Sequence, residues 1–288
     1  MEINKKGRFY VVATPIGNRE DISLRAIQTL KNVDLILAED TRHSRRLLDF
    51  HGISTSLRSC HEHNEEQQVD YVLGQLASGK QLALISDAGT PLISDPGYIL
   101  VKAIRNAGHD VIAIPGPSAA IAALSIAGLA TNRVVFEGFL PAKSNARKEA
   151  LKTLLNDVGT LVLYESTHRI REFLNDLDAA LSEIDESQRT VVLARELTKQ
   201  FETVLSGSAS DLIRQLHDDA NQTKGEFVVL IEGTKSQVKS EEVDATRLMN
   251  LLLDEMPLKK AAAITAKVTG LRKNELYERG LKIVANRD

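Results

Sequence analysis

Residues 86–97 read SDAGTPLISDPG, and the apolar run QLALIS at residues 81–86 leads directly into them. A short apolar run without alternation is typical of a strand whose two faces are both covered. The glycines and prolines after it let the backbone turn sharply and approach another group closely. This segment therefore predicts a buried strand of an α/β sheet followed by a rigid, functional turn.

Similar apolar runs, separated by predicted helices, lie on both sides of this segment in the sequence. The runs at 9–14, 33–38 and 111–115 predict further strands, and helices are predicted at 21–31, with an aspartate as N-cap, and at 64–78. Strands that alternate with helices indicate a mostly parallel sheet. The first part of the chain is therefore predicted to be an α/β domain.

Two other turns resemble the first in composition. The strand at 9–14 runs into TPIGN at 14–18, and the strand at 111–115 runs into PGPSA at 115–119. Open α/β sheets bind ligands at the carboxyl ends of their strands, where all three turns are expected. One such turn alone indicates only a tight bend, but three at one sheet edge predict a pocket built largely from main chain.

The second half of the chain repeats the alternation less regularly. A small-residue helix at 119–129 is followed by predicted strands at 134–139, 160–164, 190–194, 201–205 and 227–232, and by helices near 145–156, 169–182 and 208–217. Because the strands at 201–205 and 227–232 have little helix between them, we expect a mixed sheet. The predicted domains are 1–124, 125–235 and 236–288, with a polar linker at 234–242.

Composition limits the class of protein. The 288 residues include 36 Lys and Arg against 39 Asp and Glu, a net charge of −3, and 43% are apolar. A uniformly basic protein and wholesale disorder are excluded. The apolar run at 119–130 is too short to span a membrane, the N-terminus lacks a secretion signal, and Cys60 is the only cysteine. These features predict a cytoplasmic protein with no membrane association.

Positive charge is concentrated at the C-terminus. Residues 257–288 carry eight Lys and Arg and three acids, a charge of +5, which leaves −8 for the rest of the chain. A helix is predicted at 245–255, and residues 258–277 have the pattern of a helix-turn-helix with Gly270 at the turn. Arg272, Arg279 and Lys282 share one helix face, which favours nucleic-acid contact over a helix pair that packs a dimer.

Several common sites are absent from the sequence. It contains no G-x-G-x-x-G after the first strand, no P-loop and no G-x-S-x-G elbow. His61 and His63 form the only histidine pair, and no cysteine cluster accompanies them. We therefore expect no metal site and no nucleophilic role for Cys60.

The motifs together resemble the tetrapyrrole methylase superfamily, the class III S-adenosylmethionine-dependent methyltransferases, and within it the branch that acts on ribosomal RNA. The match runs in register over residues 8–233. The motifs that carry it are TPIGN at 14–18, AEDTRH at 38–43, SDAGTPLISDPG at 86–97, PGPSA at 115–119, EGFLP at 137–141, YESTHR at 164–169, ARELTK at 194–199 and KGE at 224–226.

This resemblance implies two α/β domains with S-adenosylmethionine in the cleft between them. It also implies methyl transfer to the ribose 2′-oxygen of a cytidine in the decoding region of 16S rRNA, within the 30S subunit, by a homodimer. The implied cofactor-binding residues are Pro15, Ile16, Asp87, Ala88, Thr90, Ser118, Ala119, Tyr164, Ala194 and Val228. Asp87 would bond ribose hydroxyls or the ammonium group, unless it caps the following segment. For Tyr164, Ala194 and Val228, the alternative to contact with the cofactor is packing within the sheet.

The residues expected to act on the methyl acceptor are polar and lie near the ends of predicted strands. The catalytic candidates are Glu39, Asp40, Arg42 and His168, with Glu165 and Glu196 as further carboxylates. The candidates for RNA contact are Lys143, Arg169, Arg195, Arg272, Arg279 and Lys282. Each has a structural ion pair or helix cap as its alternative role.

Two rival functions remain open from the sequence. One keeps the cofactor but methylates a tetrapyrrole or another small molecule. The other is a ligand-sensing, nucleic-acid-binding regulator. The basic helix-turn-helix argues against the first rival, because a small-molecule enzyme has no need of it.

Overall fold

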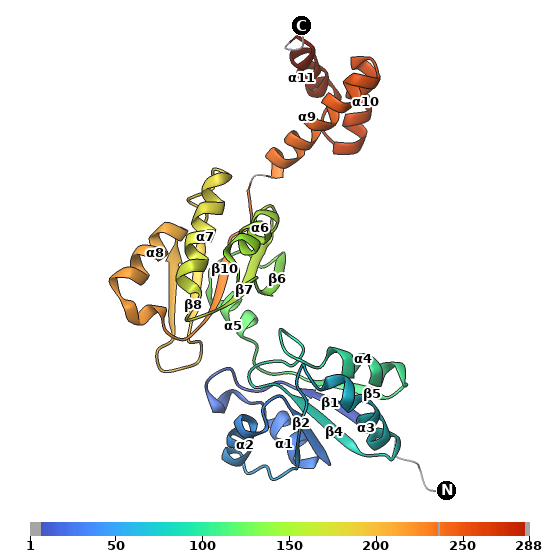
Figure 1. Ribbon diagram of the computed structural model, residues 1–288, viewed down its shortest axis with the longest axis vertical. Helices are drawn as coiled ribbons and strands as arrows, with labels where there is room; N and C mark the ends of the chain where they lie inside the picture. The colour runs from blue at the N-terminus through green and yellow to red at the C-terminus, as the bar shows by residue number, and fades with distance from the viewer. Residues whose placement is uncertain (1–6, 236, 286–288) are drawn as a thin grey trace.

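A computed structural model describes residues 7–235 and 237–285, without the side chains of 237–244 and 285. Figure 1 shows two α/β domains in sequence, followed by a helical module. The predicted fold class, two α/β domains with an all-α module after them, is confirmed.

The first domain contains a five-stranded parallel sheet in the order β3-β2-β4-β1-β5. Its strands are β1 (Arg8–Val12), β2 (Leu35–Ala38), β3 (Leu57–Ser59), β4 (Gln81–Ile85) and β5 (Asp110–Ile114). Its helices are α1 (Leu24–Asn32), α2 (Thr41–Phe50), α3 (Glu65–Ala77) and α4 (Tyr98–Asn106).

Both faces of this sheet are covered, as the continuous apolar runs predict. Side chains of α1 and α2 pack on one face with Ala83 and Ile85. Those of α3 and α4 pack on the other face with Leu82 and Leu84. Neighbouring residues of β4 thus point to opposite cores, so every residue of the strand except its first is buried.

The second domain has a mixed five-stranded sheet in the order β6-β7-β10-β8-β9, as expected. Its strands are β6 (Val134–Phe139), β7 (Thr160–Ser166), β8 (Val191–Arg195), β9 (Thr203–Gly207) and β10 (Glu226–Ile231). Only β6 and β7 are parallel, and the other neighbouring pairs are antiparallel. Its helices are α6 (Ser144–Leu154), α7 (Ile170–Glu183) and α8 (Ala209–Asp218).

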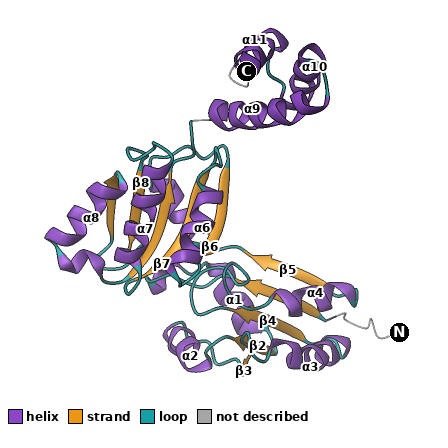
Figure 2. Cartoon of the chain, turned by 45° about the horizontal axis from the view of Figure 1, so that its top comes forward, coloured by secondary structure: helices purple, strands orange, loops and turns teal. Residues whose placement is uncertain are grey.

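The two faces of the second sheet have different neighbours. Helices α6, α7 and α8 cover one face, where Leu161 and Leu163 of β7 are buried. The opposite face buries Val162 against α5 (Ala119–Ile126) and is partly covered by Ile16 from the first domain. The two domains therefore meet on this second face: Figure 1 places α5 beside the second sheet, and Figure 2 shows the loops that lie between the two sheets.

The helical module consists of α9 (Gln237–Glu255), α10 (Leu258–Thr269) and α11 (Lys273–Ala285). Its small core buries Ala245, Met249, Ala261, Ala262 and Leu276. Gly270 has a φ of 75° and ends α10 in the left-handed conformation, so the predicted helix-turn-helix is confirmed.

Three predictions about element ends were wrong. The N-cap of α1 is Ser23, whose hydroxyl accepts from the Ala26 amide at 3.1 Å, because Asp21 belongs to a short 3-10 turn before it. The small-residue helix ends at Ile126 rather than 129. The linker predicted over 234–242 is shorter, because α9 begins at Gln237; residue 236 lies outside the described part of the chain.

Candidate functional site

The three Gly- and Pro-rich turns of the first domain are joined by hydrogen bonds to their main chain. Thr14 and Gly89 exchange two of them, at 2.8 and 3.0 Å. The Thr90 hydroxyl donates to the Pro117 carbonyl at 3.0 Å, which connects the second turn to the third. Gly89 has a φ of 80°, a conformation that side chains disfavour. The turns thus form one rigid backbone surface at the carboxyl ends of β1, β4 and β5.

A cavity of about 290 Å³ lies between this surface and the second sheet. The first domain lines it with Ile16, Ala88, Gly89, Thr90, Ile93, Ser94, Asp95, Ser118 and Ala119. The second domain lines it with Phe139, Tyr164, Glu165, Ser166, Ala194, Leu197, Lys199, Glu226, Phe227 and Val228. Neither domain alone encloses this space.

Most of the residues predicted to bind the cofactor lie in this one cavity. Those in its lining are Ile16, Ala88, Thr90, Ser118, Ala119, Tyr164, Ala194 and Val228. Pro15 is buried next to Ile16 and is not part of the lining. Asp87 is not part of it either, because its Oδ1 accepts the Asp40 backbone N–H at 3.1 Å.

An aromatic group forms one wall of the cavity. The ring of Tyr164 makes edge contacts with Phe136 and Phe139, at centroid distances of 5.2 and 5.6 Å. Burial raises the pKa of the Tyr164 hydroxyl, which is also hydrogen-bonded to the backbone of Ala120. Phe139 is 56% exposed although it lines the cavity, so this wall extends to the surface.

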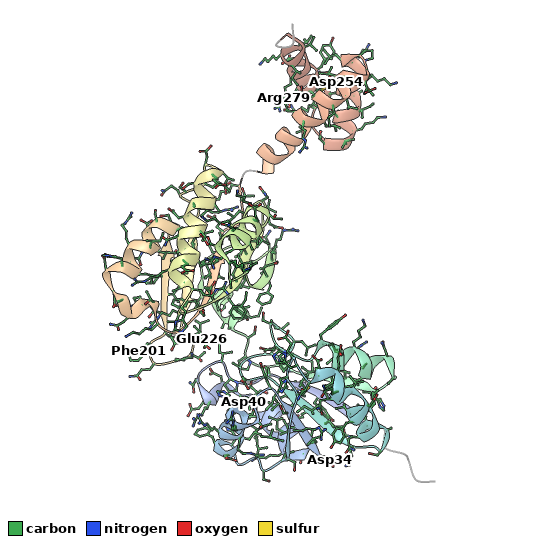
Figure 3. The ribbon with its side chains drawn as sticks, viewed as in Figure 1. Asp34, Asp40, Phe201, Glu226, Asp254 and Arg279 are labelled. Atoms are coloured by element: carbon green, nitrogen blue, oxygen red, sulfur yellow. The ribbon has the colours of Figure 1, made fainter. Side chains whose placement is uncertain are left out.

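Charged groups of the second domain also line the cavity, namely Lys199 and Glu226. The Lys199 ammonium donates to Glu196 Oε1 at 2.8 Å and to Glu226 Oε2 at 2.7 Å. The Asn18 amide donates to the Thr198 hydroxyl at 3.0 Å and so joins the two domains beside this group. Figure 3 shows Glu226 at the end of the second domain that faces the first.

Three carboxyl groups gather where β2 and β4 end. Burial, and then the charges of Glu39 and Asp87, raise the pKa of Asp95 to about 6, although a hydrogen bond from Ser86 opposes the rise. Burial and the charge of Asp87 also raise the pKa of Glu39. Of the three, only Asp95 lines the cavity.

The residues predicted to be catalytic lie outside the cavity lining. Asp40 is the N-cap of α2, since its Oδ1 accepts the amides of Arg42 and His43 at 2.8 and 3.2 Å. This contact lowers the pKa of Asp40. The Arg42 side chain is 93% exposed, and His168 is exposed in the turn after β7. Glu39 is half-buried beside Asp87.

The residues predicted to contact RNA differ in their surroundings. Arg169 is held inside the second domain, because it donates to the Leu140 carbonyl at 2.7 Å and lies 3.3 Å from Glu165. Arg195 is buried and donates to the carbonyls of Lys224 and Phe201. Both guanidinium groups thus bind other parts of the protein, which agrees with the structural role named as the alternative to RNA contact. The exposed group is Lys143, Arg272 and Lys282, whereas Arg279 is half-buried, and Figure 3 marks its place in the module.

Sequence reasoning missed several residues of the lining. Ile93, Ser94 and Asp95 belong to the quoted segment 86–97 but were not assigned to the site. Their placement depends on positive φ angles at Leu92 and Ser94, which non-glycine residues rarely adopt. Phe139 was missed as well, although its position at the end of a predicted strand was the available signal.

The structure also bears on a metal site, on the reactivity of Cys60 and on membrane-spanning helices. Within the described ranges, no group of three or more His, Cys, Asp or Glu side chains is arranged to hold a metal ion. The rings of His61 and His63 lie 6.0 Å apart, and burial raises the pKa of Cys60 to about 11. In the part of the chain that the structure describes, no helix is both long and apolar enough to cross a membrane.

Comparison with known proteins gives two family matches. Residues 8–213 match the family model of tetrapyrrole (corrin/porphyrin) methylases, and residues 239–283 match the RsmI C-terminal HTH domain. A protein of Escherichia coli, ribosomal RNA small subunit methyltransferase I, is 50% identical over 97% of this chain and 96% of its own length. The protein of the same name from Haemophilus influenzae is 48% identical over 96% of each chain.

Solved structures support the fold at lower identity. The methyltransferase CobJ matches with a TM-score of 0.58 at 18% identity, over 79% of this chain and 95% of its own. Uroporphyrin-III-C-methyltransferase from Thermus thermophilus matches with a TM-score of 0.55 at 20% identity, over 78% and 94%. At such identities the likeness shows the shared fold alone.

Proposed function

This chain belongs to the tetrapyrrole methylase family, and within it to the ribosomal RNA small subunit methyltransferase I group, and from that premise we propose that it methylates 16S rRNA. The methyl donor is S-adenosylmethionine, and the acceptor is the ribose 2′-hydroxyl of a cytidine in the 30S subunit. The observation that supports this most is the cavity between the domains, lined by eight of the ten residues expected to bind the cofactor.

The cavity residues fit such a cofactor in chemistry. The Gly89 turn exposes main chain without a side chain, and a Cβ built there would lie 3.4 Å from Ile16 Cγ2. The apolar wall at Tyr164 and Val228 suits the aromatic base of the cofactor, while the hydroxyls of Thr90 and Ser118 suit its polar groups. Pro15 and Asp87 are neighbours of lining residues, so we retain them as candidate cofactor contacts.

The protein's main task in this reaction is alignment. When bound, the cofactor supplies an activated methyl group whose transfer leaves a neutral thioether. The rigid turns and the second sheet would fix that group relative to an incoming ribose, and correct orientation is worth up to about 7–11 kcal/mol. Main-chain hydrogen bonds between Thr14 and Gly89 keep this surface from adjusting, which preserves the alignment.

RNA recognition is assigned to exposed basic residues outside the cavity. Arg272 and Lys282 lie on the surface of the helical module. Lys143 directly precedes α6 and follows Phe139, a cavity residue, by four positions in the sequence. Phosphate contacts of this kind position the nucleic acid without reading its sequence. The ribosomal substrate also places the protein in the cytoplasm, where 30S subunits are assembled.

We also propose that the protein is a homodimer. Helix α5 and the edge strand β6 expose large apolar side chains, including Ile121 at 65% and Ile126 at 47%. Strand edges and exposed apolar surface are typical of protein contacts. The Ile121→Asp variant should sediment as a monomer while retaining its thermal unfolding midpoint, and an unchanged mass would place the interface elsewhere.

Methyl transfer to isolated subunits tests the proposed function. Purified protein is incubated with labelled S-adenosylmethionine and with 30S subunits, free 16S rRNA, duplex DNA or a tetrapyrrole such as uroporphyrinogen III. We expect label in the 30S subunit. Label in the tetrapyrrole would favour the small-molecule rival, and cofactor binding without transfer, accompanied by DNA binding, would favour the regulator.

A further inference from the structure

Three acidic residues line the cavity, and two of them are already accounted for. Glu165 follows Tyr164 in β7, so its side chain leaves the opposite face of the sheet, where it lies 3.3 Å from Arg169. Glu226 is neutralised by the Lys199 ammonium at 2.7 Å. Asp95 remains, and among the described residues it has no ion pair.

The loop that carries Asp95 is held in a strained conformation. Leu92 and Ser94 have φ values of 73° and 66°, and Gly97 has a φ of 128°. A Cβ on Gly97 would lie 2.7 Å from Leu84, and a Cβ on Gly138 in β6 would lie 2.7 Å from the Ser94 hydroxyl. The loop is thus pressed between β4 and the bulge of β6. Backbone strain of this kind persists where the surrounding structure enforces it, and it clusters at functional sites.

From this placement we propose that Asp95 is the general base of the methyl transfer and accepts the proton of the ribose hydroxyl. The inference rests on the proposed function and names a residue that neither the motifs nor the comparisons assign. In the step, the 2′-oxygen forms a bond to the methyl carbon while the carbon–sulfur bond breaks and its electron pair stays on sulfur. The hydroxyl proton passes to an Asp95 oxygen and then to solvent, because Asp95 is only half-buried.

The surroundings of Asp95 suit a proton acceptor. Glu39 and Asp87 face it from the ends of β2 and β4, Tyr164 faces it from β7, and the Ser86 hydroxyl hydrogen-bonds it. Burial and the two acids raise its pKa to about 6, so at neutral pH the carboxylate is mostly ionised and still basic enough to take a proton. The rate should therefore fall as the pH drops below about 6.

The test compares Asp95→Asn with the wild-type protein in single-turnover transfer to 30S subunits. We expect the rate to fall about 100- to 10,000-fold, the range of general base catalysis, with the affinities for S-adenosylmethionine and for 30S subunits unchanged. The wild-type rate should fall about tenfold per pH unit on the acid side, and the variant's profile should be flat there. Asp95→Glu should recover part of the rate together with the acid limb.

Asp110→Asn is the matched control, because Asp110 is an exposed acid at the start of β5, and it should behave like wild type. A wild-type rate in Asp95→Asn would overturn the proposal, as would an acid limb that persists in that variant. Loss of S-adenosylmethionine affinity in both Asp95 variants would also overturn it, since Asp95 would then hold the cofactor. If the wild-type protein itself transfers no methyl to 30S subunits, the proposed function fails instead.

Discussion

Around the cavity, Gly89, Leu92 and Ser94 have positive φ angles, and Ser94 lies against β6 of the second domain, whereas in the helical module Arg272 and Lys282 stand on an exposed surface. The cavity is lined by backbone that surrounding structure fixes, and its charges are few and partly buried. The module has a small core around Met249, Ala261 and Leu276, and it carries Arg272 and Lys282 on its surface. Under the proposed function, the rigid cavity serves bond making and the exposed module serves substrate capture, so substitutions in the two regions should affect different measured quantities.

The largest effect on binding is expected from a side chain placed in the cavity. Gly89→Val adds bulk next to Ile16 and Pro117, and overpacking of about 1–3 kcal/mol corresponds to about 5- to 150-fold weaker binding of S-adenosylmethionine. Calorimetric titration measures the affinity. Gly108→Val is the matched control, because Gly108 has nearly the same φ, 76°, and no atom within 4 Å of its Cβ position. Equal loss of affinity in both variants would mean that backbone strain alone is responsible.

A smaller effect is expected in the module. Changing Arg272 and Lys282 to Ala should weaken binding to 30S subunits and reduce the slope of log affinity against log salt by up to about 1.4–1.8, because each phosphate contact contributes about 0.7–0.9. The affinity for S-adenosylmethionine and the rate at saturating subunits should not change. The control changes Lys31 and Arg105, two exposed cations of the first domain, to Ala. An unchanged salt slope in the module variant would remove the module from the RNA interface.

The smallest effect concerns the acids beside the cavity. Glu39→Gln removes one of the charges that raise the pKa of Asp95, so the acid limb of the rate profile should move to lower pH. Burial is the larger cause of the raised pKa, so a shift of less than about one pH unit is expected. Glu62→Gln, an exposed control, should leave the limb in place. Loss of both the limb and the activity in Glu39→Gln would identify Glu39 as the base.

The sequence was informative where a single local rule applies. Continuous apolar runs predicted the strands of the first sheet except β3, whose three half-buried residues give too short a signal. Helix α2 was missed because its residues are mostly polar, although Asp40 before Thr41 is a typical N-cap pattern. The Gly and Pro turns predicted a pocket of main chain at one sheet edge, because close approach of a backbone needs those two residue types, whereas Ala88, Thr90 and Ser118 followed from the family resemblance.

The rest of the site depends on contacts between distant segments. No local pattern shows that Asp87 will bond the amide of Asp40, which lies 47 residues earlier, and so turn from the cavity. Asp95 enters the lining because Leu92 and Ser94 adopt left-handed conformations that the packing of β6 enforces. Arg169 and Arg195 look like free cations in the sequence, yet carbonyl groups of neighbouring loops hold both. Tertiary packing determines where these side chains lie, and residue type alone could not predict it.

The position of the transferred methyl group tests the central claim most directly. 30S subunits that lack the modification are incubated with the protein and with S-adenosylmethionine whose methyl group carries deuterium, and the rRNA is digested to nucleosides for mass spectrometry. We predict the labelled methyl on the ribose of cytidine, at its 2′-oxygen, and a lower rate of its transfer when Gly89→Val replaces the wild-type protein at a limiting concentration of S-adenosylmethionine. Label on a nucleobase, or transfer by the Gly89→Val protein at the wild-type rate, would contradict the account.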